Sequence, residues 1–206
     1  MRSNRRRAGP QRQEILEAVV PFLKRHGTDG APVDALMRAA GLTSGALYSQ
    51  FKNKDELCSQ AICGALDAML AAYGAIVRER GQEGLRSIVS NYLSTRHAGA
   101  VAGGCTFAAL GPDMAKASPR ARKSYEARIH ELVGVFAEGL SGHGEAARRA
   151  KAQRILATML GGLTYARAMS DQDARDEYLA ELRSSVLRGI SERLQMRSRP
   201  EVAGLE

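Results

Sequence analysis

Residues 41–57, GLTSGALYSQFKNKDEL, place small hydroxyl side chains, a tyrosine and two lysines between two apolar-periodic segments. Hydroxyl and phenol groups hydrogen-bond to phosphates and base edges, and lysines neutralise phosphate charge. The small side chains would also let this backbone come close to another surface. Such residue types in this order are suited to contact with a polyanion such as double-stranded DNA. The candidate contact residues are Arg38, Thr43, Ser44, Gly45, Ala46, Tyr48, Ser49, Lys52 and Lys54.

The charge distribution supports the same interpretation. The chain of 206 residues has a formal net charge of +8, and Arg5, Arg6 and Arg7 lie in an N-terminal stretch without acidic residues. An arginine-rich arm can follow phosphates or enter a minor groove. We expect these three arginines to contact DNA, and the alternative is a solvated tail.

Residues that could support catalysis or bind a metal are sparse. The four histidines have no metal-ligand spacing, the three cysteines form no CxxC pair, and no nucleophile motif or phosphate-binding loop is present. The sequence therefore predicts no enzyme, no metal and no cofactor. Cys105 leaves one hypothesis open, in which an oxidant or electrophile modifies the thiol; a small buried hydrophobe is the alternative.

Helical periodicity dominates the elements that must position these residues. Apolar residues recur at three- and four-residue spacing, and no alternating apolar run indicates a sheet, so we predict an all-α protein of about nine helices. Two short helices around Gly41 form a helix-turn-helix, with Thr43 or Ser44 capping the second, and Asn53 caps the next helix with Glu56. The expected helices span 10–26, 32–40, 43–50, 53–80, 84–98, 104–116, 119–141, 145–169 and 173–196.

The segment VDALMRAAGLTSGALYSQFKNKDEL resembles the DNA-binding signature of the TetR family of transcriptional regulators. The similarity covers roughly the first 60 residues. The chain departs from the family pattern at Ala31 and Pro32, where a threonine or serine usually starts the second helix, and at Ser49, which is often aromatic or histidine. The matching residues are Ala40, Gly41, Leu42, Thr43, Gly45, Leu47, Tyr48, Phe51, Lys54 and Leu57.

The resemblance implies a C-terminal helical domain that binds a small molecule and dimerises through its last two helices. Two apolar stripes agree with such an interface, although they could instead be buried within one chain. The predicted interface residues are Ile155, Met159, Gly162, Leu163, Leu179, Leu182, Val186 and Ile190. The predicted lining of an apolar ligand cavity is Met69, Tyr73, Tyr92, Cys105, Phe107, Leu110, Tyr125 and Ile129.

The predicted organisation is a DNA-binding domain with its basic arm over 1–57, an effector-binding and dimerisation domain over 58–197, and a disordered tail over 198–206. We expect a homodimeric repressor that a small-molecule effector releases from an inverted-repeat operator. A non-specific architectural DNA-binding protein is the alternative, and a helical enzyme is the third. No run approaches the roughly 20 apolar residues that span a bilayer. A cytoplasmic protein without membrane contact is therefore expected.

Overall fold

The computed structural model describes residues 12–142 and 144–191, and within these ranges the chain is helical without any strand. The prediction of an all-α protein of about nine helices is confirmed. Residues 1–11, with Arg5, Arg6 and Arg7, and the predicted tail over 198–206 lie outside the described residues. The elements are α1 (Arg12–His26), α2 (Val33–Ala39), the 3₁₀ turn η1 (Ser44–Ala46), α3 (Leu47–Gln50), α4 (Lys54–Tyr92), α5 (Thr95–Gly99), α6 (Thr106–Lys116), α7 (Pro119–Glu138), α8 (Glu145–Ala168) and α9 (Gln172–Ser191).

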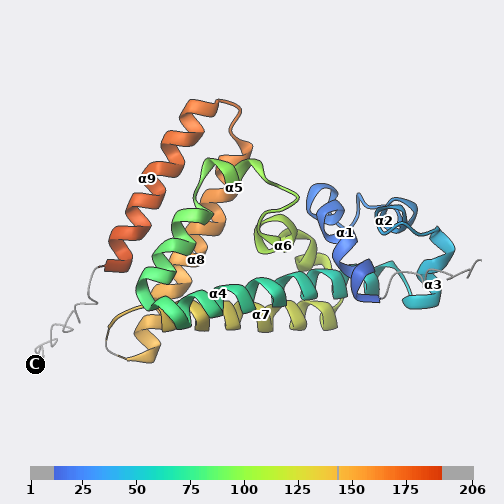
Figure 1. Cartoon of the computed structure of the whole chain (residues 1–206), viewed down its shortest axis with the longest axis horizontal. Helices are drawn as coiled ribbons and strands as arrows, with labels where there is room; N and C mark the ends of the chain where they lie inside the picture. The colour runs from blue at the N-terminus through green and yellow to red at the C-terminus, as the bar shows by residue number, and fades with distance from the viewer. Residues whose placement is uncertain (1–11, 143, 192–206) are drawn as a thin grey trace, which may run out of the picture.

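Helix α4 connects the two ends of the molecule. Figure 1 shows α1, α2 and α3 at one end of α4, α8 and α9 at the other, and α7 running alongside it. The sequence predicted an end near Arg80, and the backbone does leave helical geometry at Gly81, where φ is +52°. Such a φ is accessible to glycine at little cost. Helical structure then resumes and continues to Tyr92.

By length and composition, α4 is also the one helix among the described residues that could cross a membrane. This corrects the expectation that no segment of the chain is apolar enough. The central helix of a soluble fold meets the same criterion, and α4 contacts α1, α6, α7 and α9.

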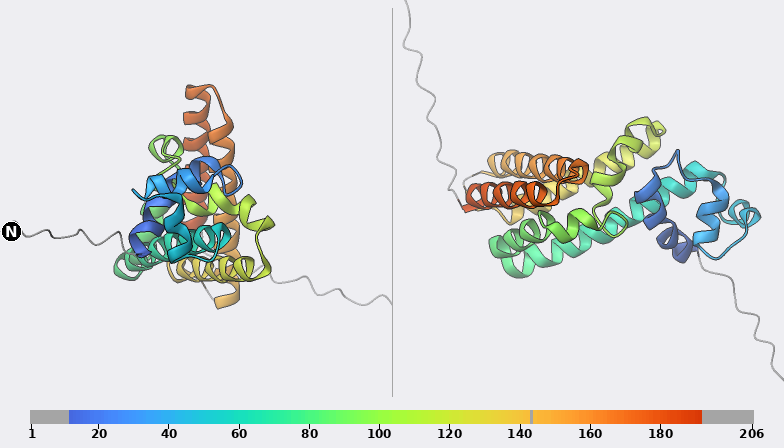
Figure 2. Two further views of the ribbon diagram at one scale, coloured as in Figure 1. Left: turned by 90° about the vertical axis from the view of Figure 1, so that its right-hand side faces the viewer. Right: turned by 90° about the horizontal axis from the view of Figure 1, so that it is seen from above.

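Helix α6 lies between the N-terminal helices and the rest of the fold, as the views in Figures 1 and 2 agree. The Lys24 ammonium on α1 donates to the carbonyl of Gly104 at 2.6 Å. Both the backbone N–H and the hydroxyl of Thr28 donate to Asp113 of α6, at 2.6 and 2.9 Å. The end of α1 is therefore tied directly to α6 and to the loop before it.

The apolar stripes of α8 and α9 lie inside one subunit, where they pack these helices against each other and against α4 and α7. A stripe at helical spacing shows that a face is apolar, and it does not show what covers that face. That these residues form the contact between subunits stays a prediction, although all of them except the half-buried Leu182 are already buried within one subunit. The buried members are Ile155, Met159, Gly162, Leu163, Leu179, Val186 and Ile190.

Gly162 of α8 packs directly against the Leu182 side chain of α9. A Cβ built on Gly162 would overlap Cδ2 of Leu182 and lie 3.4 Å from its Cγ. We expect Gly162→Ala to lower the free energy of unfolding by about 1–3 kcal/mol, because overpacking outweighs the better helix propensity of alanine. Denaturant titration measures this change.

Gly64 on α4 is the matched control for that substitution. A Cβ there meets nothing within 4 Å. Gly64→Ala should therefore raise stability by up to about 1 kcal/mol. A shift of the same sign for both variants would contradict the tight α8 and α9 contact.

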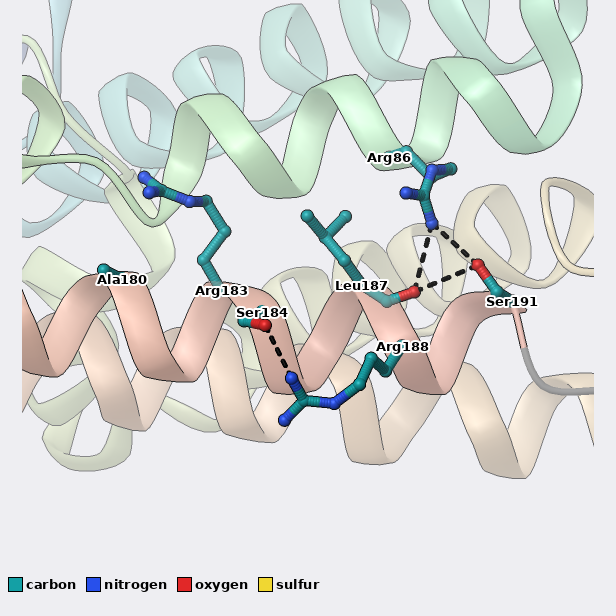
Figure 3. Close-up of a pocket in the computed structure, with 7 residues that line it drawn as sticks. All are labelled: Arg86, Ala180, Arg183, Ser184, Leu187, Arg188 and Ser191. Carbon is teal, nitrogen blue, oxygen red and sulfur yellow. Dashed lines mark hydrogen bonds between the residues drawn. The ribbon is translucent and has the colours of Figure 1, made fainter.

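Arginines tie α9 to α4 along an open surface hollow of about 610 Å³ (Figure 3). Arg86 of α4 donates to the carbonyl of Leu187 at 3.1 Å and to the Ser191 hydroxyl at 2.8 Å. Arg183 of α9 donates to the carbonyl of Leu93 at 3.1 Å. These guanidinium groups hydrogen-bond to backbone carbonyls that join α9 to α4. The arginines that line the hollow therefore serve to dock α9 on α4.

Candidate DNA-binding surface and effector cavity

The helix-turn-helix is built from α2, a turn at Gly41, and η1 continuing into α3. Gly41 has a φ of +71°, a region that L side chains rarely adopt, and this lets the chain reverse within a short turn. Leu36, Met37 and Leu47 are fully buried, and α2 packs on α1 and on η1. The sequence prediction of these elements agrees with the structure.

The outer side of η1 and α3 carries the predicted contact residues. Tyr48 is 70% exposed, an unusual position for a large aromatic side chain in a folded chain. A Cβ added to Gly45 meets nothing within 4 Å, so the backbone there is open to an approaching partner. Arg38, Thr43, Gly45, Tyr48, Ser49 and Lys52 are exposed, and Ser44, Ala46 and Lys54 are half-buried.

The start of this helix differs from the predicted cap. Thr43 occupies the N-cap position without a side-chain hydrogen bond. The Ser44 hydroxyl donates to the carboxylate of Asp34 on α2, and the Ser49 hydroxyl donates to the carbonyl of Ala46 at 2.7 Å. The expectation that Thr43 or Ser44 caps the helix was therefore wrong. A nearby carboxylate competed for Ser44, and the first turn is 3₁₀ in geometry.

The start of α4 is capped by two reciprocal hydrogen bonds. Asn53 Oδ1 accepts from the backbone N–H of Glu56 at 2.9 Å, and Glu56 Oε2 accepts from the N–H of Lys52 at 2.7 Å. The hydrogen bond from Lys52 is the main cause that lowers the pKa of the Glu56 carboxyl. This capping holds Lys52 and Lys54 beside α3, close to Tyr48 in the chain.

Arg12 is a structural residue of this surface that the sequence analysis missed. Its guanidinium lies over the Phe51 ring, 4.1 Å from the centroid, and pairs with Glu56 Oε1 at 3.3 Å. It also donates to Gln60 at 2.9 Å. These contacts tie the start of α1 to the start of α4, and no local pattern in the sequence indicates them because the partners are 39 or more residues away.

A cavity of about 530 Å³ lies where α1, α4, α5 and the loop before α6 meet. Four predicted ligand residues, Met69, Tyr73, Tyr92 and Cys105, line both this cavity and its apolar extension, a void of only about 10 Å³ toward Phe136 and Met159. The sequence analysis missed the polar part of the lining. Those residues are Lys24, Asn91, Arg96, His97 and Thr106.

Four other predicted ligand residues do not line this cavity. The Phe107 and Tyr125 rings pack together with centroids 5.3 Å apart, and Leu110 is fully buried in the core. Ile129 is 39% exposed on the outer side of α7. The apolar face of α6 turns toward α7 and the core, so only its first turn reaches the cavity, and a ligand contact of these four residues stays a prediction.

Two tyrosines and the Cys105 thiol set the chemistry of the inner cavity. The Tyr92 side chain is 4% exposed, and its hydroxyl meets the Cys105 thiol but has no nitrogen or oxygen hydrogen-bond partner within the described residues. Burial raises the pKa values of Tyr73 and Tyr92, with a smaller effect from Cys105 beside them. Both phenols are therefore neutral hydrogen-bond donors at physiological pH. Outside the cavity, burial raises the pKa of Cys58 to about 11.

The tautomer of His97 follows from its two partners. The backbone N–H of Cys105 points at Nε2 at 3.1 Å, so Nε2 is an acceptor. Nδ1 then carries the proton and donates to the carbonyl of Tyr92 at 2.7 Å. If Nε2 were protonated, its N–H would point at the backbone N–H of Cys105, and two donors would face each other. The neutral ring therefore holds the loop before α6 against the end of α4.

Stability should decline in acid through His97. Burial lowers the pKa of His97, and nearby Arg167 and Lys24 act in the same direction, although the hydrogen bond to Tyr92 opposes them. The unfolded chain, with a histidine pKa of about 6.5, then binds the proton more tightly than the folded chain. The unfolding free energy should fall as pH drops below about 6.5 and should be unaffected by this group above that value.

Thermal unfolding measured between about pH 8 and about pH 5 checks this expectation. In the matched variant His97→Gln, the side-chain oxygen can still accept from Cys105 but does not titrate. The variant should lose less stability in acid than the wild type. Parallel pH profiles of the two proteins would contradict the assignment.

Comparison with known proteins gives the same architecture. The profile of the family described as bacterial regulatory proteins, tetR family, matches residues 15–61. A TetR transcriptional regulator from Legionella pneumophila superposes with a TM-score of 0.75 at 15% identity, covering 89% of this chain and 99% of the other. No curated protein matches the sequence.

Two further structures share the fold. One is Bacillus subtilis FadR, a transcriptional regulator in complex with stearoyl-CoA, with a TM-score of 0.63, 18% identity, and coverage of 88% of this chain and 98% of the other. The other is the reduced form of Escherichia coli NemR, with a TM-score of 0.70, 16% identity, and coverage of 84% and 95%. These matches indicate no catalytic family. The family match identifies residues 15–61 as a helix-turn-helix of the tetR type, and the solved structures share the all-helical fold of the whole chain.

Proposed function

We propose that this protein is a cytoplasmic transcriptional repressor that binds an inverted-repeat operator as a homodimer and is released by a small-molecule effector. The observation that carries the proposal is the path of α4. This helix begins at the DNA-binding surface with Lys54 and supplies Met69 and Tyr73 to the cavity. A ligand in the cavity therefore touches the same helix that supports the helix-turn-helix.

The proposed DNA contacts follow from exposure and chemistry. Thr43, Gly45 and Tyr48 face outward at the start of α3, which would enter the major groove. Lys52 and Lys54, next to the capped start of α4, would pair with phosphates, as would Arg38. Ser44, Ala46 and Ser49 would lie close to the backbone of the DNA. The basic arm with Arg5, Arg6 and Arg7 completes this proposal from outside the described residues.

Release would follow from differential binding to two conformations. A ligand that favours an altered position of α4 or α6 shifts the population toward that state. Because α1 is tied to α6 through Thr28 and Asp113 and packs on α4, either movement would change the position of the helix-turn-helix. In a dimer this changes the spacing of two recognition helices, which must match major grooves about one helical turn apart.

We propose that the dimer forms through the outward faces of α8 and α9, in place of the buried stripes. On α8, Ala157, Thr158, Gly161 and Tyr165 recur at three- and four-residue spacing, and Tyr165 is 71% exposed. Small side chains let two helices approach closely, and the exposed tyrosine offers a large area to bury. Leu182 on α9 is the member of the predicted interface that remains half-exposed.

The domain division at residue 57 stays a proposal. Helix α4 runs unbroken across this position, from Lys54 onward. The two proposed domains would therefore share one rigid element, which suits a signal that passes from the cavity to the DNA-binding end.

Footprinting on the DNA that flanks the gene for this protein tests the proposed function. We expect a discrete protected region with inverted-repeat symmetry. The architectural alternative gives uniform protection without paired half-sites, and that result would reject operator binding. The helical enzyme has no supporting observation, since His130 is exposed on α7 and, within the described residues, no group of His, Cys, Asp and Glu could hold a metal ion.

A further inference from the structure

The cavity has a charged mouth and an apolar interior. Lys24 from α1 and Arg96 and His97 from α5 line the outer part, while Met69 and Tyr73 line the inner part and its apolar extension. A pocket of about 530 Å³ is within the usual range for small-molecule sites. A ligand that fills both parts must carry a polar end and an apolar body.

The mouth carries positive charge without acidic partners. No aspartate or glutamate lines the cavity. Within the described residues, Lys24, Arg96 and Arg167 form no ion pair with a carboxylate. Arg167 stands behind the mouth, where its guanidinium donates to the carbonyls of Ala98 and His97 at 3.3 and 3.4 Å. Uncompensated cations around a partly enclosed pocket attract anions.

Lys24 lies at the mouth of the cavity, where burial disfavours the charged form of its ammonium. Its Nζ donates to the Gly104 carbonyl at 2.6 Å, which leaves two N–H donors for a ligand. Burial and the nearby Arg167 lower the pKa of Lys24. A bound anion would relieve both effects. Because Lys24 belongs to α1, that anion would also contact the N-terminal helical unit itself.

The Tyr92 hydroxyl is a second, independent sign of a ligand. It is buried at 4% exposure and lines the cavity, and among the described residues it meets the Cys105 thiol, a weak acceptor, but no nitrogen or oxygen acceptor. A buried donor without an acceptor costs free energy unless a bound molecule or water supplies one.

We propose that the cavity binds an amphipathic carboxylate, with its carboxylate group between Lys24 and Arg96 and its apolar body against Met69, Tyr73 and Tyr92. Lys24 then acts as the sensing residue, because it links the carboxylate to α1. When the carboxylate accepts from the two remaining N–H donors and draws the ammonium toward the mouth, the contact with Gly104 weakens and α1 is released from the loop before α6. This release rests on the proposed function, whereas carboxylate binding does not.

Binding to the full-length protein without DNA tests the site. The probes are decanoate and naphthoate, each compared with its primary amide and with the phosphate monoester of the matching alcohol, by calorimetric titration. We expect at least one carboxylate to bind about tenfold more tightly than its amide, since a charge-assisted hydrogen bond is stronger than a neutral one. Lys24→Met should remove this preference and leave the affinity for the amide unchanged.

Lys123→Met, an exposed lysine on α7, is the matched control and should retain the preference. Lys24→Gln replaces Lys24→Met if the latter does not fold. The proposal is overturned if neither carboxylate binds, if amides bind as tightly, if only phosphate monoesters bind, or if both Lys24 variants keep the preference. A protein that gives the operator footprint without a carboxylate preference would support the proposed function and reject the carboxylate site. A protein that prefers carboxylates but gives no footprint would reject the proposed function and support the carboxylate site.

Discussion

Gly161→Arg is expected to convert the proposed dimer to a monomer while each subunit stays folded. A Cβ at Gly161 meets nothing within 4 Å inside the subunit, so the arginine side chain would project from α8 without a clash. Arginine also has a better helix propensity than glycine, by about 1 kcal/mol. In the proposed dimer, however, the same side chain would separate the two α8 helices at Ala157, Thr158 and Tyr165.

The mass in solution, measured by light scattering after size exclusion, should halve, and the thermal midpoint of the monomer should be retained. Operator affinity should drop by about a hundredfold or more, because two linked half-site contacts become independent. Gly99→Arg is the control, since Gly99 is exposed on α5 with no atom near its Cβ. A Gly161→Arg protein that remains dimeric would place the interface elsewhere.

Helix α8 shows what the sequence could not decide. Apolar stripes at Ile155, Met159 and Leu163 are the strongest periodic signal of α8, and the subunit uses them for its own core. The outward face of the same helix consists of small residues and Tyr165, which no hydrophobic pattern distinguishes from ordinary solvated surface. Periodicity therefore located the helices and their apolar faces, but the number of faces that need a partner depends on tertiary packing.

The helix-turn-helix was predictable because its determinants are local. Gly41 sets the turn, Leu47 and Phe51 are buried at a spacing that suits one short helix, and Asn53 caps α4 through Glu56. Each of these interactions lies within a few residues of chain. Where a residue from another helix intervenes, as Asp34 does at Ser44, the local prediction of the cap was wrong.

The cavity was predictable only in part for the same reason. Met69 and Tyr73 lie on one face of a long helix and were found from spacing, and Tyr92 and Cys105 were also identified. Lys24 is 80 residues from Gly104 in the chain, and its contact exists only because α1 packs beside α6. The charged mouth of the cavity, which determines the class of ligand, is thus a product of tertiary structure.

Gly45→Glu is expected to abolish specific DNA binding without destabilising the protein. Gly45 lies in η1, at the tip that would approach the groove, and a Cβ there meets nothing within 4 Å. The glutamate therefore has room in the free protein, and glycine is not required for a positive φ at this position. Against DNA, the same side chain adds bulk and a negative charge beside phosphates, and like-charge contacts at an interface cost several kcal/mol.

A cost of this size predicts a loss of affinity of about a hundredfold or more for an operator fragment in a fluorescence anisotropy titration. Gly99→Glu makes the same change in net charge on α5, at a distance from the helix-turn-helix in Figure 1, and should bind nearly as well as the wild type. The pair separates local insertion from overall charge. If both variants weaken binding equally, then the net charge of +8 supplies the affinity. If only Gly45→Glu loses operator affinity while its thermal midpoint is unchanged, the start of α3 is the part that meets the DNA. Tyr48→Ala should then lower the affinity less than Gly45→Glu does, because it removes one contact and adds no repulsion.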